Sequence, residues 1–529
     1  MGKNKQPDTL KAYNMRSAVV NYYLLVMFTF FELFLTNQYA SARTDKFLLF
    51  IILSGVLIVT TVTISLVYTY DKGIKKQGGI KTERPIFALS VTDVAFFAFF
   101  IFAAITTLIS PYKLDSLLGS AGRDNGLVLL FLYLCVYFIV SRFYYFKNYV
   151  LSAFLVFGSI VCLLAILHFF YIDPLGIMEG YSQNIIDDFG STIGNKNLIA
   201  SYMCIFLPFC LMMFTLQKTK PMIIMSGVAL VFAYCGLLVA GSNSGYIGFF
   251  FMMFFAFAVC VRKAELLRRL MLGLFVMFSG SLFLRLFSFI MDDKSKGFEA
   301  IGKTLIYSKW IFIIIAITGA MTAILYAIKF KGITITKWPK NVLTAIVVAI
   351  ACALVSFCGY LFIKYSFIDT KTDIGSLSQI FRFDDRWGTH RGFMWINGVK
   401  EFLEFDFLHI LFGSGCDTFY HVFEPHFAEL TSRFNNSSTN CIHNEYLNYL
   451  ITRGVLGLIS YVTILVAVIV RALKSSKENT LALLFILPVV TYAAQAVVNI
   501  YQPITTPFLI IFIALTECIA RKSNKANTL

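Results

Sequence analysis

Charged residues are scarce in this sequence. Asp, Glu, Lys and Arg make up only 14% of the 529 residues, whereas 58% are hydrophobic and Phe alone occupies 56 positions. Soluble domains usually carry about 25% charged residues, so the composition excludes an ordinary soluble fold. Apolar runs of about 20 residues, long enough to cross a bilayer, recur along the chain. The sequence therefore predicts an all-α integral membrane protein.

The sequence also lacks the short motifs of nucleotide and metal chemistry. It has no Gly-rich phosphate loop ending in Lys-Ser/Thr, no dinucleotide fingerprint and no metalloprotease helix. The 11 cysteines follow no metal-ligand spacing. The segment HVFEPHF, residues 421–427, offers two histidines, but Pro425 prevents the regular helix that such a site would need. We expect neither a metal nor another cofactor.

About fourteen apolar segments are expected to be spans, and one long polar segment separates two groups of them. Spans 1–11 fall in residues 1–366, a large extracytoplasmic loop in 367–444, and spans 12–14 in 445–529. The first span lacks a small-residue cleavage site and is expected to be an uncleaved anchor. The expected spans lie near 18–36, 47–70, 91–110, 127–141, 149–171, 198–216, 222–240, 245–261, 270–291, 307–328, 342–366, 445–470, 480–499 and 504–520.

The net charge of +16 is distributed unevenly across the expected membrane. If the N-terminus is cytoplasmic, more than half of the 45 Lys and Arg residues fall in cytoplasmic segments that hold few acids. The positive-inside rule predicts this asymmetry, so both termini should be cytoplasmic. Because the rule accounts for the basic charge, we expect membrane lipid as a partner and no nucleic acid.

The long loop concentrates ionisable residues, and a loop of this length among short connections is usually functional. Its segment WINGVKEFLEF, residues 395–405, has apolar residues at helical spacing. This spacing predicts either an amphipathic helix at the membrane interface or a helix packed on the span ends. The histidines and arginines of residues 367–444 are His390, His409, His421, His426, His443, Arg382, Arg386, Arg391 and Arg433.

Smaller polar segments lie on the same expected side. GSAGRDNG carries Arg123 just before the fourth span, and GSTIGNKN carries Asn195 and Asn197 just before the sixth. Cys416 and Cys441 also fall on this side, where a disulfide could persist, although free thiols are the simpler expectation. Any chemistry should therefore face outward.

The segment CIHNEYLNYLITRGVLG, residues 441–457, opens the twelfth span with polar residues. At about 100° per residue, Gly454 and Gly457 fall within roughly 40° of His443 on a helical wheel. Glycines let another backbone approach a membrane helix closely, so this stripe should pack into the bundle. His443 would then lie at the rim of a protein-lined cavity, where an imidazole can accept a proton. Nearby arginines suit phosphate oxygens, which suggests a lipid phosphate or diphosphate as donor.

These residues resemble the motifs of the O-antigen ligase family, in particular its branch from Gram-positive bacteria. That family carries His followed by Asn, Ser or Gln, then nine residues and Gly-x-x-Gly, and here His443-Asn444 and Gly454-Val-Leu-Gly457 have the same spacing. Four further blocks agree in order: LLGSAGRDNGL, GSTIGNKNLIASYMCIFLP, HRGFMW and ILFGSGCDTF. One position departs, because Ser242-Asn243 stands where the family commonly has Ser-Arg.

The resemblance implies a fold similar to the GT-C-type glycosyltransferases. It also implies metal-independent transfer of a glycan from undecaprenyl diphosphate to an acceptor hydroxyl, of a glycan, lipid or protein, outside the cytoplasmic membrane. His443 would be the base or orienting acceptor, fixed by Asn444 or Glu445. Arg391 and Arg123 would hold the diphosphate, with Arg386 in reserve.

Asn195 and Asn197 would bind sugar or shape the cavity floor. For the arginines the alternative role is anchoring to lipid headgroups, and for His443 it is a structural role. Rival functions are a repeat-unit polymerase of the same family and, from another class, a flippase for lipid-linked sugars. Arg285, inside the ninth expected span, fits transport.

Overall fold

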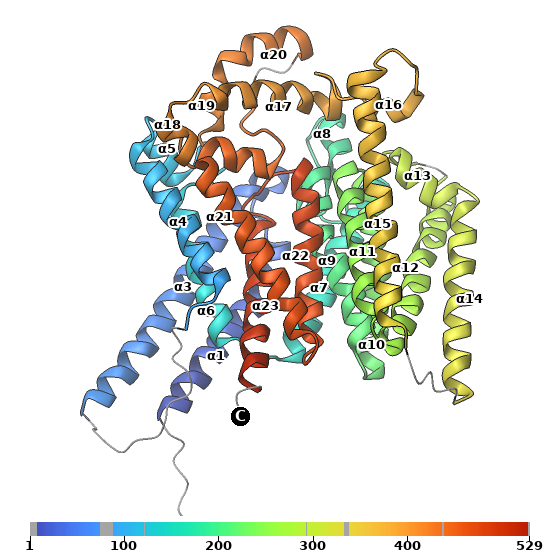
Figure 1. Ribbon diagram of the computed structural model, residues 1–529, viewed down its shortest axis with the longest axis horizontal. Helices are drawn as coiled ribbons and strands as arrows, with labels where there is room; N and C mark the ends of the chain where they lie inside the picture. The colour runs from blue at the N-terminus through green and yellow to red at the C-terminus, as the bar shows by residue number, and fades with distance from the viewer. Residues whose placement is uncertain are drawn as a thin grey trace, which may run out of the picture.

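The computed structural model of the chain describes residues 8–74, 88–120, 122–292, 294–332, 338–435 and 438–526. These residues form a helical bundle, with one antiparallel pair of two-residue strands, β1 (Phe189–Gly190) and β2 (Gly194–Asn195). The long helices run side by side, and the short ones gather at one end (Figure 1). The predicted all-α membrane fold is confirmed.

The bundle contains these helices: α1 (Asp8–Met27), α2 (Phe30–Leu33), α3 (Gln38–Ile74), α4 (Val91–Ile109), α6 (Leu127–Phe143), α7 (Asn148–Phe169), α9 (Lys196–Leu216), α10 (Lys220–Ala240), α11 (Asn243–Cys260), α12 (Ala264–Ile290), α14 (Trp310–Phe330), α15 (Lys340–Ile363), α21 (Glu445–Ser475), α22 (Leu481–Gln495) and α23 (Thr506–Ala526). The shorter helices are α5 (Lys113–Leu118), α8 (Gln183–Asp188), α13 (Ala300–Tyr307), α16 (Ser378–Phe381), α17 (Trp387–Leu403), α18 (Phe407–Phe412), α19 (Phe419–Phe423) and α20 (Phe427–Phe434).

Every segment expected to span the membrane overlaps a helix, although the first, 18–36, covers the end of α1, a break and the short α2. Within the described residues, 11 helices are long and apolar enough to cross a membrane. The first and last expected spans, α1 and α23, and the shorter apolar helix α6 are not among those 11. The expected count of about fourteen is therefore not confirmed, although the chain is a multi-pass membrane protein.

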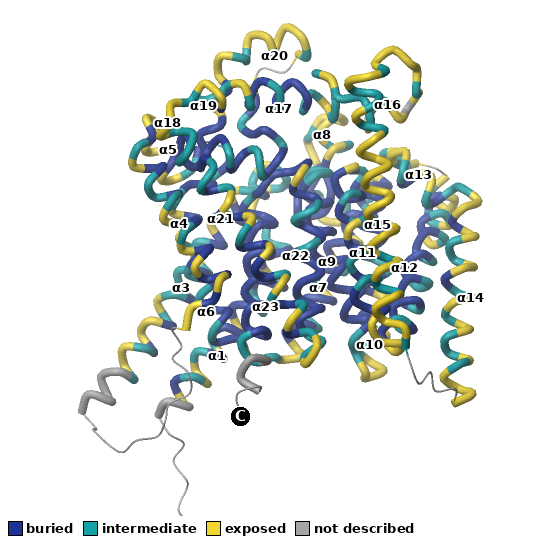
Figure 2. The backbone as a smooth tube through the Cα atoms, viewed as in Figure 1, coloured by how far each residue is buried: buried dark blue, intermediate teal, exposed yellow. Residues whose placement is uncertain are grey.

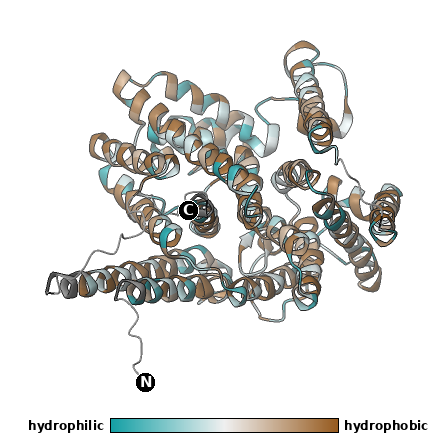
Figure 3. Ribbon diagram, turned by 60° about the horizontal axis from the view of Figure 1, so that its bottom comes forward, coloured by the Kyte–Doolittle hydropathy of each residue, from teal (hydrophilic) through white to brown (hydrophobic). Residues whose placement is uncertain are grey.

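Helix α9 lies at the centre of the bundle, where the backbone is buried along its length (Figure 2). Every residue in its most apolar window is buried, as expected for a helix that is hydrophobic on all sides. Helices α7, α10, α11, α12 and α22 pack around it. By contrast, α15 has no buried residue in its apolar window. Figure 3 shows the apolar character of the bundle helices.

Residues 367–444 cover one end of the bundle, which we call the loop face (Figure 1). A second hydrophobic cluster ties this segment together and to α21, with α17 contributing Phe393 and Phe402, α19 contributing Phe423, and α21 contributing Ile451. Of the two alternatives for the segment around Trp395, packing on the span ends accounts for the buried side of α17.

Candidate functional site

His443 lies at the loop face, in the turn that leads into α21. Its backbone is left-handed, with φ of 52°. Asn444 follows as the N-cap of α21, and its side chain accepts a hydrogen bond from the Leu447 amide at 3.0 Å. This cap fixes the end of the helix. Because His443 precedes the helix, the helical-wheel angle predicted between His443 and the two glycines does not apply.

The glycine motif of α21 serves a close backbone contact. Gly454 has φ of 66° and ψ of −174°, which interrupts the helix. A Cβ atom there would lie 2.3 Å from the Leu411 carbonyl carbon, so the end of α18, with the turn that follows it, can approach only a glycine. That turn then pairs with α21, because the amides of Ser414 and Gly415 donate to the carbonyls of Ile451 and Thr452 at 3.0 and 3.1 Å. The expected close approach occurs, but at a kink rather than along a continuous stripe.

The Cys441 thiol marks the point where the predicted cations converge. It is buried, beside the Arg123 guanidinium and the His443 ring. Burial alone would raise the pKa of this thiol, but Arg123 and then His443 lower it to about 6. Arg391, from the first regular turn of α17, also interacts electrostatically with the Cys441 thiol. The structure therefore brings together His443, Arg123 and Arg391 in a region that favours an anion.

Arg123 is held in this region by Asp417. Arg123 is 4% exposed and Asp417 is 3% exposed, and their charges interact. One carboxylate oxygen of Asp417 accepts hydrogen bonds from the amides of Ser120 and Asn125 at 2.9 and 3.1 Å, which fixes the loop that carries Arg123. Burial raises the pKa of Asp417 to about 6, against the opposing effect of Arg123. The Nε atom of Arg123 has no hydrogen-bond partner.

The remaining predicted site residues have other recorded contacts. Arg386 is exposed at the start of α17, and its amide donates to Asp384. Asn195 caps α9 by accepting from the Leu198 amide at 3.2 Å. The side chain of Asn197 accepts from the Ser242 hydroxyl at 2.8 Å. Both asparagines are therefore engaged in shaping the protein.

Glu445 is also engaged away from the imidazole. Its carboxylate is fully buried and accepts hydrogen bonds from the hydroxyls of Tyr461 and Tyr492 at 2.6 and 3.2 Å. The Nδ1 atom of His443 is buried and has no hydrogen-bond partner. We expected Asn444 or Glu445 to orient the His443 ring. Their contacts do not include that ring and so do not account for its orientation.

Three other histidines at the loop face are each paired with a carboxylate, and we call them the carboxylate-paired histidines. They are His409 with Asp406 at 2.8 Å, His421 with Asp115 at 2.7 Å, and His426 with Glu401 at 2.8 Å. The ring of His390 instead lies 4.2 Å from the Phe434 ring. His443 differs from the paired three because its ring lies beside the Cys441 thiol.

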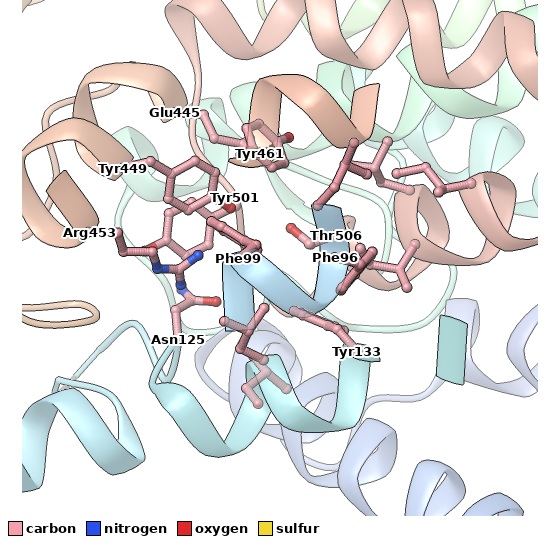
Figure 4. Close-up of a pocket in the computed structure, with 16 residues that line it drawn as sticks. Phe96, Phe99, Asn125, Tyr133, Glu445, Tyr449, Arg453, Tyr461, Tyr501 and Thr506 are labelled. Carbon is pink, nitrogen blue, oxygen red and sulfur yellow. Dashed lines mark hydrogen bonds between the residues drawn. The ribbon is translucent and has the colours of Figure 1, made fainter. Parts of the chain in front are cut away.

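Arg453, to which the sequence assigned no role, lines a cavity under the loop face (Figure 4). Its guanidinium lies 4.5 Å from the Tyr449 ring centre and 4.7 Å from that of Phe99. The available signal was an arginine inside an apolar span. Cys416 and Cys441 are both free, as the simpler expectation had it.

Comparison with known proteins adds one match. Residues 303–462 match the family model described as O-Antigen ligase. This segment runs from α13 into α21 and includes Arg391, His443 and Gly454. No curated protein matches the chain.

Proposed function

We propose, from the premise that this chain belongs to the O-antigen ligase family, that it transfers a glycan from an undecaprenyl-diphosphate carrier to an acceptor hydroxyl. The family match and the many apolar helices establish the broader role, which is cell-surface polysaccharide assembly at a membrane. One observation supports the finer proposal: His443, Arg123 and Arg391 all interact electrostatically with the Cys441 thiol.

The arginines act on the leaving group. Arg123 and Arg391 hold the donor diphosphate, and their charge stabilises the additional negative charge that develops as the bond from the sugar to the diphosphate breaks. Guanidinium groups suit this task because their planar donors match phosphate oxygens. Two such groups supply the positive charge that a metal ion provides in other phosphate chemistry, so the proposed transfer is metal-independent.

His443 acts on the acceptor. A hydroxyl is a poor nucleophile until a partner takes its proton. As the acceptor oxygen bonds to the sugar carbon, the proton passes to an imidazole nitrogen of His443 and then to solvent. The unpartnered Nδ1 atom supports this role, because no recorded hydrogen bond commits it to a structural contact.

The side of the membrane follows from the charge distribution. The basic segments favour cytoplasmic termini, which supports the proposal that the loop face, and with it His443, lies outside the cytoplasmic membrane. A flippase is disfavoured because its site would lie near the membrane midplane. Arg285, the feature that fitted transport, lies over the Phe312 ring at 5.5 Å.

The test is a transfer assay with the purified full-length protein. The protein is supplied with an undecaprenyl-diphosphate glycan and candidate acceptors in the presence of EDTA, and released lipid diphosphate is measured. We expect release that depends on the acceptor. Release with a second lipid-linked repeat as acceptor would identify a polymerase. No release with any acceptor, together with measurable lipid flipping, would replace the proposal by transport.

A further inference from the structure

The cavity beneath the loop face lies between α4, α6, α21 and α23 (Figure 4). Its walls are mixed. Polar side chains, among them Asn125, Arg453 and Tyr501, gather on one side in the close-up. The aliphatic part of the wall is made by Leu129, Leu130, Ile464, Leu509, Ile510 and Ile513. The cavity therefore offers both a polar wall and an apolar wall.

Arg453 brings a positive charge into this cavity, and the Glu445 carboxylate, which lines the same cavity, interacts with it electrostatically. It is 2% exposed, and its Nε and Nη1 atoms have no hydrogen-bond partner. Within the described part of the chain, no carboxylate lies within ion-pair distance of it. Aromatic rings partly compensate, since the Tyr501 ring centre is 5.5 Å away and two other rings are closer. Glu445 accepts hydrogen bonds from two tyrosine hydroxyls, so the two unpartnered nitrogens leave this guanidinium able to bind an anion.

Two further groups on the cavity wall lack partners. The side-chain oxygen of Asn125, which is 2% exposed, accepts no hydrogen bond, and the hydroxyl of Tyr133, which is 5% exposed, makes none. Buried polar groups are bonded in the great majority of cases. Three unpartnered groups in one cavity therefore indicate a ligand that offers several acceptors and at least one donor.

The ligand must also suit the apolar wall. A phosphate matches the planar donors of a guanidinium, its oxygens can accept from a tyrosine hydroxyl, and a protonated phosphate oxygen can donate to an amide oxygen. An aliphatic chain attached to it would bury itself against the leucines and isoleucines. We propose that this cavity binds the phosphate end of a lipid, with Arg453 as the counter-ion.

The cavity adjoins the candidate site. The Tyr501 phenol interacts electrostatically with both Arg123 and Arg453, and Asn125 follows Arg123 by two residues. Two sources of the lipid phosphate fit this position, the diphosphate carrier of the donor and an ordinary membrane phospholipid. Assigning the carrier rests on the proposed function, whereas the binding of a lipid phosphate does not.

The experiment measures lipid binding to the purified full-length protein by native mass spectrometry, with no glycan and no acceptor. The probes are undecaprenyl diphosphate, phosphatidylglycerol and undecaprenol, which lacks phosphate. We expect Arg453→Gln to weaken binding of the phosphate-bearing lipid by roughly 10- to 100-fold, the loss of one charged hydrogen-bonded contact. Binding of undecaprenol should not change. The phosphate probe that loses affinity identifies the source.

Two further variants keep the result interpretable. Tyr133→Phe removes only a hydroxyl and should fold, and it should weaken binding several-fold. Arg433→Gln is the matched control, because Arg433 lies on the loop segment with carboxylate partners Asp385 and Glu429 and should not affect binding. Unchanged affinity in both Arg453→Gln and Tyr133→Phe, or phosphate lipids that bind no better than undecaprenol, would overturn the proposal. If lipid binding depends on Arg453 but the protein has no transfer activity, the lipid-phosphate proposal is supported and only the proposed function is contradicted.

Discussion

The histidines at the loop face divide into two environments. The carboxylate-paired histidines make bonds of 2.7–2.8 Å to acids, whereas His443 lies beside the Cys441 thiol, with which Arg123 also interacts. His421 shows what the first environment does: its ring bonds Asp115 of α5 and stacks on Tyr112, with ring centres 3.9 Å apart. Such a pair connects the loop segment to the bundle by a side-chain contact.

All four histidines lie on the loop face, so the two environments differ in the neighbours of the ring, and we expect the neighbours to decide the role of each histidine. A nitrogen that bonds a carboxylate is committed to an ion pair. The Nδ1 atom of His443 has no such commitment, and the surrounding guanidinium groups favour an anionic substrate. We therefore expect substitutions to affect activity in one environment and stability in the other.

The largest effect is expected for His443→Gln. The amide keeps polarity and approximate size but cannot accept the proton, so the rate of transfer should fall by roughly 10²- to 10⁴-fold. The measurement is the turnover of lipid diphosphate release at saturating donor. Thermal stability in detergent should stay near that of the unsubstituted protein, and turnover near normal would mean that another group takes the proton.

The next effect is expected for Arg123→Gln. Loss of this guanidinium removes charge from the donor site, so catalytic efficiency should fall by roughly 10²-fold. It should also raise the pKa of the Cys441 thiol from about 6, because the charge of Arg123 is the largest factor that lowers it. The rate of thiol modification in detergent, followed against pH, checks the second point. An unshifted pH profile would place Arg123 away from the thiol.

Smaller effects are expected for His421→Gln and His426→Gln, tested one at a time. Each removes a partly exposed ion pair, which typically contributes about 1 kcal/mol or less. We expect turnover within a few-fold of normal and a slightly lower unfolding temperature. A loss of turnover as large as that of His443→Gln would abolish the distinction between the two environments.

The smallest effect concerns pH and Asp417. Its pKa in the folded protein, about 6, lies above the ordinary value of 3.8, so its contribution to stability is complete below about pH 4 and is lost as pH rises through 6. The unfolding temperature of the normal protein should therefore fall between pH 4.5 and 6 relative to Asp417→Asn. Equal slopes for the two proteins would show that the carboxyl is not protonated on folding.

The sequence predicted the helices well, because long apolar runs identify membrane helices without tertiary information. It did not predict the kink at Gly454 or the left-handed backbone of His443. A helical wheel assumes a continuous helix, and only the approach of the Leu411 backbone reveals why the helix breaks. The number of spans could not be predicted from the sequence either, because the terminal and short helices lie near the limits of length and hydropathy that define a membrane span.

The candidate site was predicted in part. Arg123, Arg391 and His443 were selected from three distant segments, and the structure brings them to one thiol. The contacts of Asn195 and Glu445 are structural, which their residue types could not show. The sequence did not identify Arg453, because the cavity beside it and its two unpartnered nitrogens are visible only in three dimensions.

The most direct test of the account is chemical rescue of His443→Ala in a single turnover. Donor and acceptor are bound to the variant, imidazole is added, and the release of lipid diphosphate is followed. The account predicts very slow release without imidazole and a rate that rises with the concentration of its free base. Release by His443→Ala at the rate of the unsubstituted protein, with no imidazole present, would contradict it.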